Sequence, residues 1–99
     1  MPDAGVIVVT RFIVPDSAAT DFLAAARRLI AAFATRPGHI SSRAAHALDD
    51  ADRWLVISEW VGVGAWRRAL SAYDVRVEAV PLLSLAEAEP SVYEVLSDG

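Results

Sequence analysis

The chain has no cysteine, lysine, asparagine or glutamine among its 99 residues. Without cysteine it can form no disulfide, no thiolate metal site and no thiol nucleophile. Its 9 basic residues, all arginine, are outnumbered by 13 acidic residues, which gives a net charge of -4. Nucleic-acid binding requires clustered positive charge that displaces counterions, so this acidic balance argues against a nucleic-acid partner.

Targeting signals and long hydrophobic runs are also missing. The first five residues carry no basic segment of the kind that opens a signal peptide. No apolar stretch approaches the roughly 18 residues that a membrane span needs. We therefore expect a soluble, cytoplasmic protein that neither spans nor binds a membrane.

Hydrophobic residues, by contrast, are abundant. They make up 55% of the chain, whereas soluble domains usually contain about 45–50%. A chain of this length forms one domain, 1–99, near the lower limit for an independent core. A small domain with so much apolar surface usually buries part of it against another copy of itself, so we expect a homodimer.

The order of the expected elements predicts an α+β, ferredoxin-like fold with an antiparallel sheet. The hydrophobic pattern predicts strands at 6–14, 39–48, 53–61 and 91–96. A first helix begins after Pro15, with Asp16 or Ser17 as N-cap, and ends before Pro37. Further helical segments cover 62–70 and the stretch from 71 to the break at Glu89 and Pro90. The resulting order, β-α-β-β-α-β, is that of the ferredoxin-like fold.

The strand pattern also predicts that both faces of the sheet are apolar. One face receives the helices, and the other carries Ile7, Val9, Ile13, Leu55 and Ile57. A second sheet is the simplest cover for that other face. The sequence therefore predicts a homodimer that closes a dimeric α/β barrel across a two-fold axis.

The chain resembles the antibiotic biosynthesis monooxygenase family of dimeric α/β-barrel proteins over nearly its whole length. The resemblance is carried by VTRF at 9–12, RPGH at 36–39, SEW at 58–60, AW at 65–66, SAYD at 71–74 and PSVYEV at 90–95. It implies oxygenation that uses no metal, flavin or other cofactor, in which an electron-rich phenol becomes a quinone, or else degradation of haem.

The haem-degrading branch of the family departs from this sequence at two places. That branch has an asparagine on the first strand, where this chain has Thr10, and a histidine ligand in the last helix, where 73–83 contains none. We therefore do not expect haem degradation. The resemblance instead implies O2 and a small aromatic molecule as partners.

Trp66, Tyr73 and Arg76 are the candidate catalytic residues. Trp66 lies on the inner side of the short helix, and Tyr73 follows seven residues later. Both could simply fill the core, or they could line a pocket between helices and sheet where an indole N–H and a phenol O–H bind a polar aromatic ligand. Arg76, three residues beyond Tyr73, would share its face and could hold a phenolate or superoxide, or it could be a solvated surface residue.

Thr10, Trp54, Trp60 and His46 are the candidate substrate contacts. Trp54 and Trp60 share one strand face and form either core or pocket wall. Either His46 or His39 could act as a general base with a near-neutral pKa. Because they stand seven residues apart on one expected strand, we predict that they point to opposite faces and do not bind one metal ion together.

Three functions remain open from the sequence. The first is a cofactor-independent monooxygenase for a phenolic or polycyclic aromatic molecule, which would consume oxygen. The second is a non-catalytic dimer that binds a hydrophobic metabolite or a partner protein. The third is an isomerase or cyclase on the same scaffold, with a histidine base and no need for oxygen.

Overall fold

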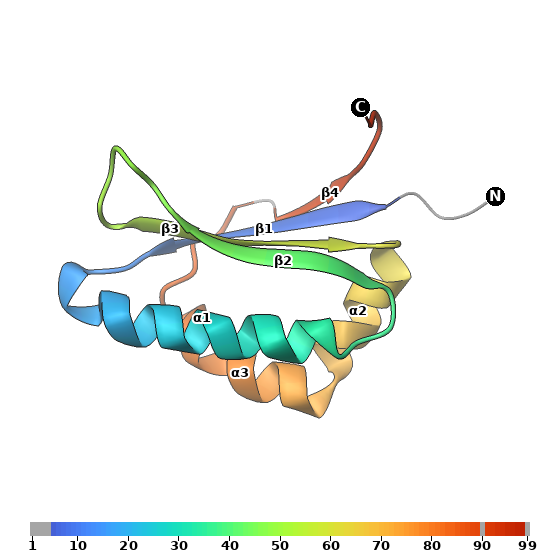
Figure 1. Cartoon of the computed structure of the whole chain (residues 1–99), viewed down its shortest axis with the longest axis horizontal. Coiled ribbons are helices and arrows are strands. Elements are labelled where there is room, and N and C mark those ends of the chain that lie inside the picture. The colour runs from blue at the N-terminus through green and yellow to red at the C-terminus, as the bar shows by residue number, and fades with distance from the viewer. Residues whose placement is uncertain (1–4, 90, 99) are drawn as a thin grey trace.

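The computed structural model describes residues 5–89 and 91–98, which form one antiparallel sheet with helices on one side (Figure 1). The strands are β1 (Val6–Ile13), β2 (His39–His46), β3 (Arg53–Trp60) and β4 (Val92–Glu94), in the sheet order β2-β3-β1-β4. The helices are the 3-10 turn η1 (Asp16–Ala18), α1 (Ala19–Ala34), α2 (Val63–Ser71) and α3 (Tyr73–Leu83). The predicted α+β ferredoxin-like fold is therefore confirmed. No helix in the described part of the chain is long and apolar enough to cross a membrane.

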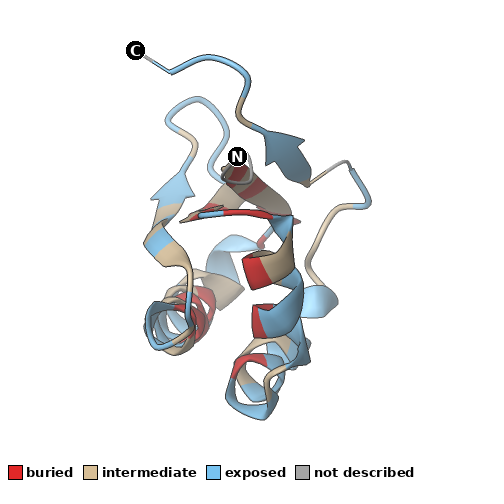
Figure 2. Ribbon diagram, turned by 90° about the vertical axis from the view of Figure 1, so that its right-hand side faces the viewer, coloured by how far each residue is buried: buried red, intermediate tan, exposed pale blue. Residues whose placement is uncertain are grey.

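The alternation of side chains along β1 and β3 decides which residues enter the core. Val8 of β1 pairs with Ser58 of β3, and Phe12 pairs with Trp54. Paired residues share a face, so the even-numbered residues of both strands turn toward the helices. Figure 2 shows the buried residues concentrated between sheet and helices. They include Val6, Val8, Phe12, Val56, Ser58 and Trp60 from the sheet and Phe22, Ala26, Leu29 and Phe33 from α1.

The opposite face of the sheet, which we call the outer face, is covered by no helix of the described residues (Figure 1). Ile7, Val9, Leu55 and Ile57 lie on this face and are only partly buried. Ile13, at the end of β1, is 44% exposed. The apolar second face expected from the sequence is thus present in the structure.

A β-bulge in β2 changes the direction of its first residues. The pairing with β3 shifts between His39 and Ser41, so that His39 lies opposite Trp60 while His46 lies opposite Trp54. Because both tryptophans face the helices, both histidines do so too. The prediction that the two histidines point to opposite faces was wrong, since one extra residue in the bulge reverses the alternation.

Two expected helix boundaries differ. Neither Asp16 nor Ser17 is an N-cap, because both lie in the 3-10 turn η1 that precedes α1. α2 and α3 are separate helices, as expected, and the extended residue Ala72 divides them. α3 ends at Leu83, well before the expected break at Glu89 and Pro90, of which Pro90 lies outside the described residues.

Gly38 makes the turn between α1 and β2. Its φ of 85° is a conformation that side chains with a Cβ rarely adopt. A Cβ at this position would lie 2.5 Å from the Cβ of Ala65 and 2.9 Å from the Cγ2 of Val61. The turn therefore packs directly against the first turns of α2, the helix that carries Trp66.

Candidate functional site

A hollow of about 240 Å³, which we call the inner pocket, lies between the sheet and the three α-helices. The strands form its floor and the helices form its roof. The residues of β1 and β3 that line it are the even-numbered ones, which face the helices. The lining consists of Val8, Thr10, Phe12, Leu29, Phe33, Val56, Ser58, Trp66, Leu70, Ala79, Leu82, Leu83 and Ser91. Two predicted site residues, Thr10 and Trp66, are brought together here.

The lining of the inner pocket is apolar and, among the described residues, carries no charge. Its polar groups are the hydroxyls of Thr10, Ser58 and Ser91 and the indole of Trp66. Ser58 is 2% exposed, and its Oγ accepts a hydrogen bond of 2.9 Å from the Nε1 of Trp60. This bond uses one of the two lone pairs of the hydroxyl oxygen and leaves the other lone pair and the hydrogen available to other groups.

Aromatic rings stiffen one end of the inner pocket. The ring of Trp66 lies 5.7 Å from that of Phe33 and 5.6 Å from that of Trp60, in edge-on and tilted arrangements. Such contacts stabilise aromatic clusters beyond the burial of area alone. Trp66 reaches the pocket surface, whereas Trp60 is fully buried and supports the lining from behind through Ser58 and Trp66.

Tyr73 and Arg76 do not reach the inner pocket, which corrects the expectation that they stand beside Trp66. Tyr73 is 82% exposed, and Arg76 is exposed on the same helix. The reason is the break at Ala72, because helical spacing counted from Trp66 does not continue from α2 into α3. Tyr73 is the first residue of α3 and turns outward, and Arg76, one turn later, follows it.

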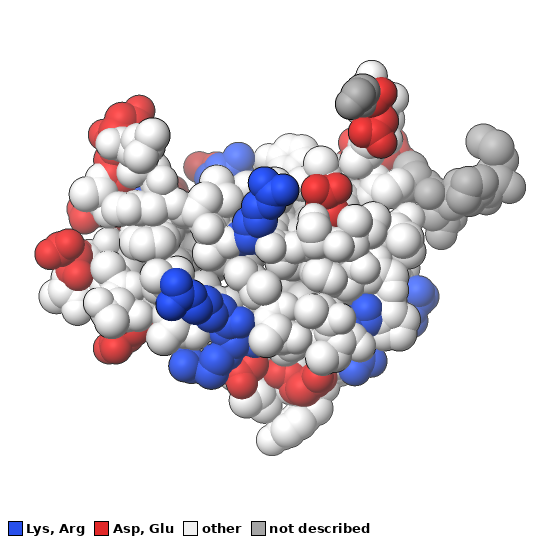
Figure 3. All heavy atoms as spheres, viewed as in Figure 1, with Lys and Arg blue, Asp and Glu red and all other residues white. Residues whose placement is uncertain are grey.

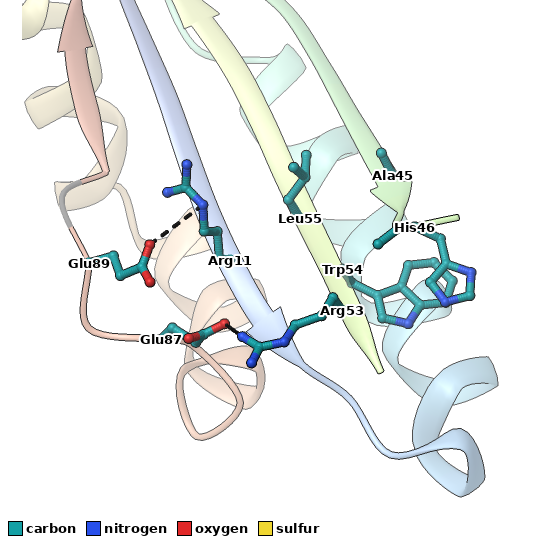
Figure 4. A pocket seen from close by; sticks show the side chains of 9 residues that line it. Arg11, Ala45, His46, Arg53, Trp54, Leu55, Glu87 and Glu89 are labelled. Carbon is teal, nitrogen blue, oxygen red and sulfur yellow. Dashed lines mark hydrogen bonds and ion pairs between the residues drawn. The ribbon is translucent and has the colours of Figure 1, made fainter. Parts of the chain in front are cut away.

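Trp54 and His46 lie elsewhere, at a second hollow of about 350 Å³ that we call the outer pocket (Figure 4). It lies at one end of the sheet and is lined by Arg11, Ala45, His46, Ala47, Arg53, Trp54, Leu55, Glu87 and Glu89. The rings of His46 and Trp54 stack at 4.1 Å with an angle of 13° between their planes. The Nε2 atom of His46 is 2.6 Å from the carbonyl oxygen of Ala51.

Ion pairs occupy the charged groups of the outer pocket. The Nε of Arg11 is 3.6 Å from a carboxylate oxygen of Glu89, and Arg53 pairs with both Glu87 and Asp50 (Figure 4). The hydrogen bond and the negative charge of Glu87 raise the pKa of Arg53 above its ordinary value. The arginines and glutamates of this pocket thus partner each other.

His39 lies on the helix side of the sheet together with His46, whereas the sequence predicted opposite faces for the two histidines. Its Nε2 lies 2.7 Å from the Oγ of Ser42, and its ring stands edge-on to Trp60 at 5.1 Å. Burial lowers the pKa of His39 from its ordinary value, against a smaller raising effect of a hydrogen bond with the backbone of Ser41. No sequence signal predicts the bulge that turns this ring toward the helices.

Among the described residues, no group of three or more histidine, aspartate or glutamate side chains could hold a metal ion. The two histidines lie at opposite ends of β2, one beside Trp60 and the other beside Trp54.

The family model described as antibiotic biosynthesis monooxygenase matches residues 5–76 of this chain. Among solved structures, SnoaB from Streptomyces nogalater, a cofactor-independent oxygenase, is 26% identical with a TM-score of 0.84, and the match covers 96% of both chains. Rv0793 from Mycobacterium tuberculosis is 15% identical with a TM-score of 0.80, over 96% of this chain and 98% of that one. A conserved protein from Bacteroides thetaiotaomicron is 14% identical with a TM-score of 0.84, over 94% and 99%. The last two show a shared fold alone. None of the curated proteins matches the sequence.

Proposed function

The chain belongs to the antibiotic biosynthesis monooxygenase family, and we propose that it is a cofactor-independent oxygenase that oxidises a small phenol in the inner pocket. The observation that carries this proposal is the uncharged hollow in which Trp66 and the hydroxyls of Thr10 and Ser58 meet. The likeness to SnoaB, an oxygenase that needs no cofactor, supports the same reaction class.

The reaction balances without any external reductant. A phenol with a free para position, such as 1-naphthol, reacts with O2 to give the para-quinone, here 1,4-naphthoquinone, and one molecule of water. One oxygen atom enters the ring and the other leaves as water, with the para hydrogen and one proton that replaces the proton lost from the hydroxyl. The phenol supplies all four electrons that O2 accepts, so the protein has only to bind, orient and deprotonate it.

The inner pocket suits that task physically. Its apolar walls favour a flat aromatic ring and a nonpolar gas, and they keep out the water that would quench reactive oxygen species. The hydroxyls of Thr10 and Ser58 supply hydrogen-bond partners that would orient the phenol oxygen. A volume of about 240 Å³ falls below the roughly 300–1,000 Å³ of most small-molecule sites. The size therefore favours one or two fused rings over larger polycyclic substrates.

The working form of the enzyme in this proposal is a homodimer that buries the outer face. The centre of this face is formed by Ile7, Val9, Leu55 and Ile57. Two further apolar side chains of the sheet are exposed, Tyr93 at 43% and Ile40 at 57%. An apolar surface of this kind on a small domain usually marks an interface. A two-fold contact of the face with itself would cover it with a second sheet.

The direct test is oxygen uptake in the presence of 1-naphthol. We expect one O2 consumed for each 1,4-naphthoquinone formed, and with ¹⁸O2 we expect one labelled oxygen in the quinone and one in water. Binding of 1-naphthol without oxygen uptake would favour the non-catalytic binding protein. Conversion under argon would favour an isomerase or cyclase.

A pair of variants ties the activity to the inner pocket. Ala79 lines the pocket from α3, whereas its neighbour Val80 is 63% exposed. We expect Ala79→Phe to fill the hollow and reduce the rate at least about tenfold, while Val80→Phe on the same helix leaves it unchanged. Equal loss in both variants, or in neither, would contradict the inner pocket as the site. Thermal unfolding of both variants checks that each remains folded.

A further inference from the structure

Oxidation of a phenol requires that its hydroxyl proton leave the inner pocket, yet no titratable side chain lines that pocket among the described residues. The ionised groups of the outer pocket are paired with each other, as Figure 4 shows for Arg53 and Glu87. Among the described residues, the route that a side chain can offer the proton runs through a hydroxyl of the lining to a base behind it.

Ser58 is the lining hydroxyl that has a hydrogen-bonding neighbour of the right kind. It lies directly opposite Ser42 on the same face of the sheet. Side chains that face each other across antiparallel strands have Cβ atoms about 4.5–5.5 Å apart. The two hydroxyls make no direct hydrogen bond in the described part of the chain, so the route needs one water between them to hand the proton on. Ser42 in turn lies 2.7 Å from the Nε2 of His39.

The bulge in β2 is what completes this route. His39 and Ser42 are three residues apart, and on a regular strand they would point to opposite faces. The register shift between His39 and Ser41 brings both onto the face that carries Ser58 and Trp60. Bulges that redirect one side chain are frequent beside active sites.

We propose that Ser58, Ser42 and His39 form a proton relay that carries the substrate's hydroxyl proton out of the inner pocket, with His39 as the final acceptor; the proposal rests on the proposed function. The substrate oxygen gives its proton to the Oγ of Ser58 as Ser58 passes its own hydrogen through the intervening water to Ser42. Ser42 passes its hydrogen to the Nε2 of His39. The products are a phenolate, two unchanged serines and a histidinium.

The surroundings of His39 fit an acceptor. Its lowered pKa keeps the ring neutral near pH 7, and in the tautomer with its proton on Nδ1 the Nε2 atom accepts the Ser42 hydrogen. The ring is partly exposed, so it can release the proton to water. Charged groups on adjoining elements have other partners, since Arg36 pairs with Asp74 at 3.8 Å and Glu59 accepts from Ser41 on the outer face.

The test uses 4-nitrophenol, a one-ring phenol that turns yellow on ionisation and is too electron-poor to be oxidised like a naphthol. A relay changes the rate of proton transfer and leaves the equilibrium ratio of phenolate to phenol at a given pH the same, so the rate is measured. A temperature jump at pH 7 under argon perturbs the ionisation of the bound probe, and absorbance follows its relaxation. We expect His39→Gln and Ser42→Ala to slow this relaxation about tenfold or more. Ser41→Ala, on the opposite face one residue away, is the matched control and should leave the relaxation rate unchanged.

The outcomes separate the relay from the oxygenase proposal. A relaxation rate that depends on His39 and Ser42, with no oxidation of 1-naphthol, would support the relay and overturn the oxygenase. Oxidation of 1-naphthol with equal relaxation rates in wild type and both variants would overturn the relay alone. A protein that neither binds 4-nitrophenol nor oxidises 1-naphthol would overturn both. Imidazole added to His39→Gly should restore naphthol oxidation, which a purely structural role of the ring would not allow.

Discussion

At the scale of single residues, the burial of His39 has a consequence for stability. Burial disfavours the charged ring and lowers its pKa below the ordinary value of 6.5. Between the two values the unfolded chain binds a proton that the folded chain does not. The free energy of unfolding should therefore fall as the pH is lowered through 6.5 toward the folded pKa, and this loss should be absent above 6.5.

We expect His39→Gln to reduce the fall in the free energy of unfolding that the wild type shows as the pH is lowered below 6.5. The substitution removes the titrating group, while all carboxylates that titrate at lower pH stay the same in both proteins. Urea unfolding of wild type and variant between about pH 7.5 and 5.5 measures the difference. Loss of the hydrogen bond to Ser42 would lower the free energy of unfolding of the variant by the same amount at every pH. The informative quantity is therefore the slope of the free energy of unfolding against pH. Parallel profiles would contradict the burial argument.

At the scale of elements, the turn at Gly38 connects the helix that ends before it with the helix that carries Trp66. Gly38→Ala would force an alanine to a φ of 85° and place its Cβ 2.5 Å from the Cβ of Ala65. We expect a loss of about 1–3 kcal/mol in the free energy of unfolding. Because α2 must shift to relieve the contact, we also expect weaker binding of 1-naphthol in the inner pocket.

Gly64→Ala is the matched control for this prediction. Gly64 lies inside α2, and an added Cβ would meet only the flexible end of Arg68, at 3.1 Å. An alanine there should leave stability unchanged or raise it by up to about 1 kcal/mol, because alanine favours helix. Thermal or urea unfolding of the two variants tests the pair. A Gly38→Ala variant as stable as the Gly64→Ala variant would contradict the close packing of the turn.

The elements also show what the sequence could predict and why. The strands around Val8 and Val56 were predicted correctly because alternation of apolar residues follows directly from the strand geometry. That alternation also placed Thr10 in the pocket. The bulge beside Ile40 leaves no comparable pattern, because it depends on how distant elements pack. A new helical segment after residue 70 was expected, but the direction in which its first turn faces was not, and Tyr73 therefore lies at the surface.

At the scale of the whole molecule, charge and apolar surface are distributed differently. On the face seen in Figure 3, arginines and acidic residues are scattered over a largely uncharged surface and in places lie side by side. The outer face of the sheet, by contrast, gathers Val9, Leu55 and Ile57 in one place with no helix over them (Figure 1). A partner that binds there would be recognised by shape and apolar area, as a second copy of the same sheet would be.

Ile57→Glu should separate the proposed dimer into folded monomers. Ile57 lies at the centre of the outer face, paired with Val9 on one side and Arg43 on the other. In a monomer the new carboxylate is exposed and can pair with Arg43, so the fold should survive. In a dimer it would be buried without a guaranteed partner, which costs roughly 3 kcal/mol or more and weakens association at least about 100-fold.

Sedimentation of the purified protein measures this directly. We expect wild type at twice the chain mass of 10.6 kDa and Ile57→Glu at the single mass at the same concentration. Val80→Glu, which adds the same charge to an exposed position on α3 beneath the opposite side of the sheet, should remain dimeric. A monomeric wild type would overturn the dimer, and a Val80→Glu monomer would move the interface from the sheet to the helices. The inner pocket lies on the helix side of the sheet, so a folded Ile57→Glu monomer that still binds 4-nitrophenol would show that each chain holds a complete pocket.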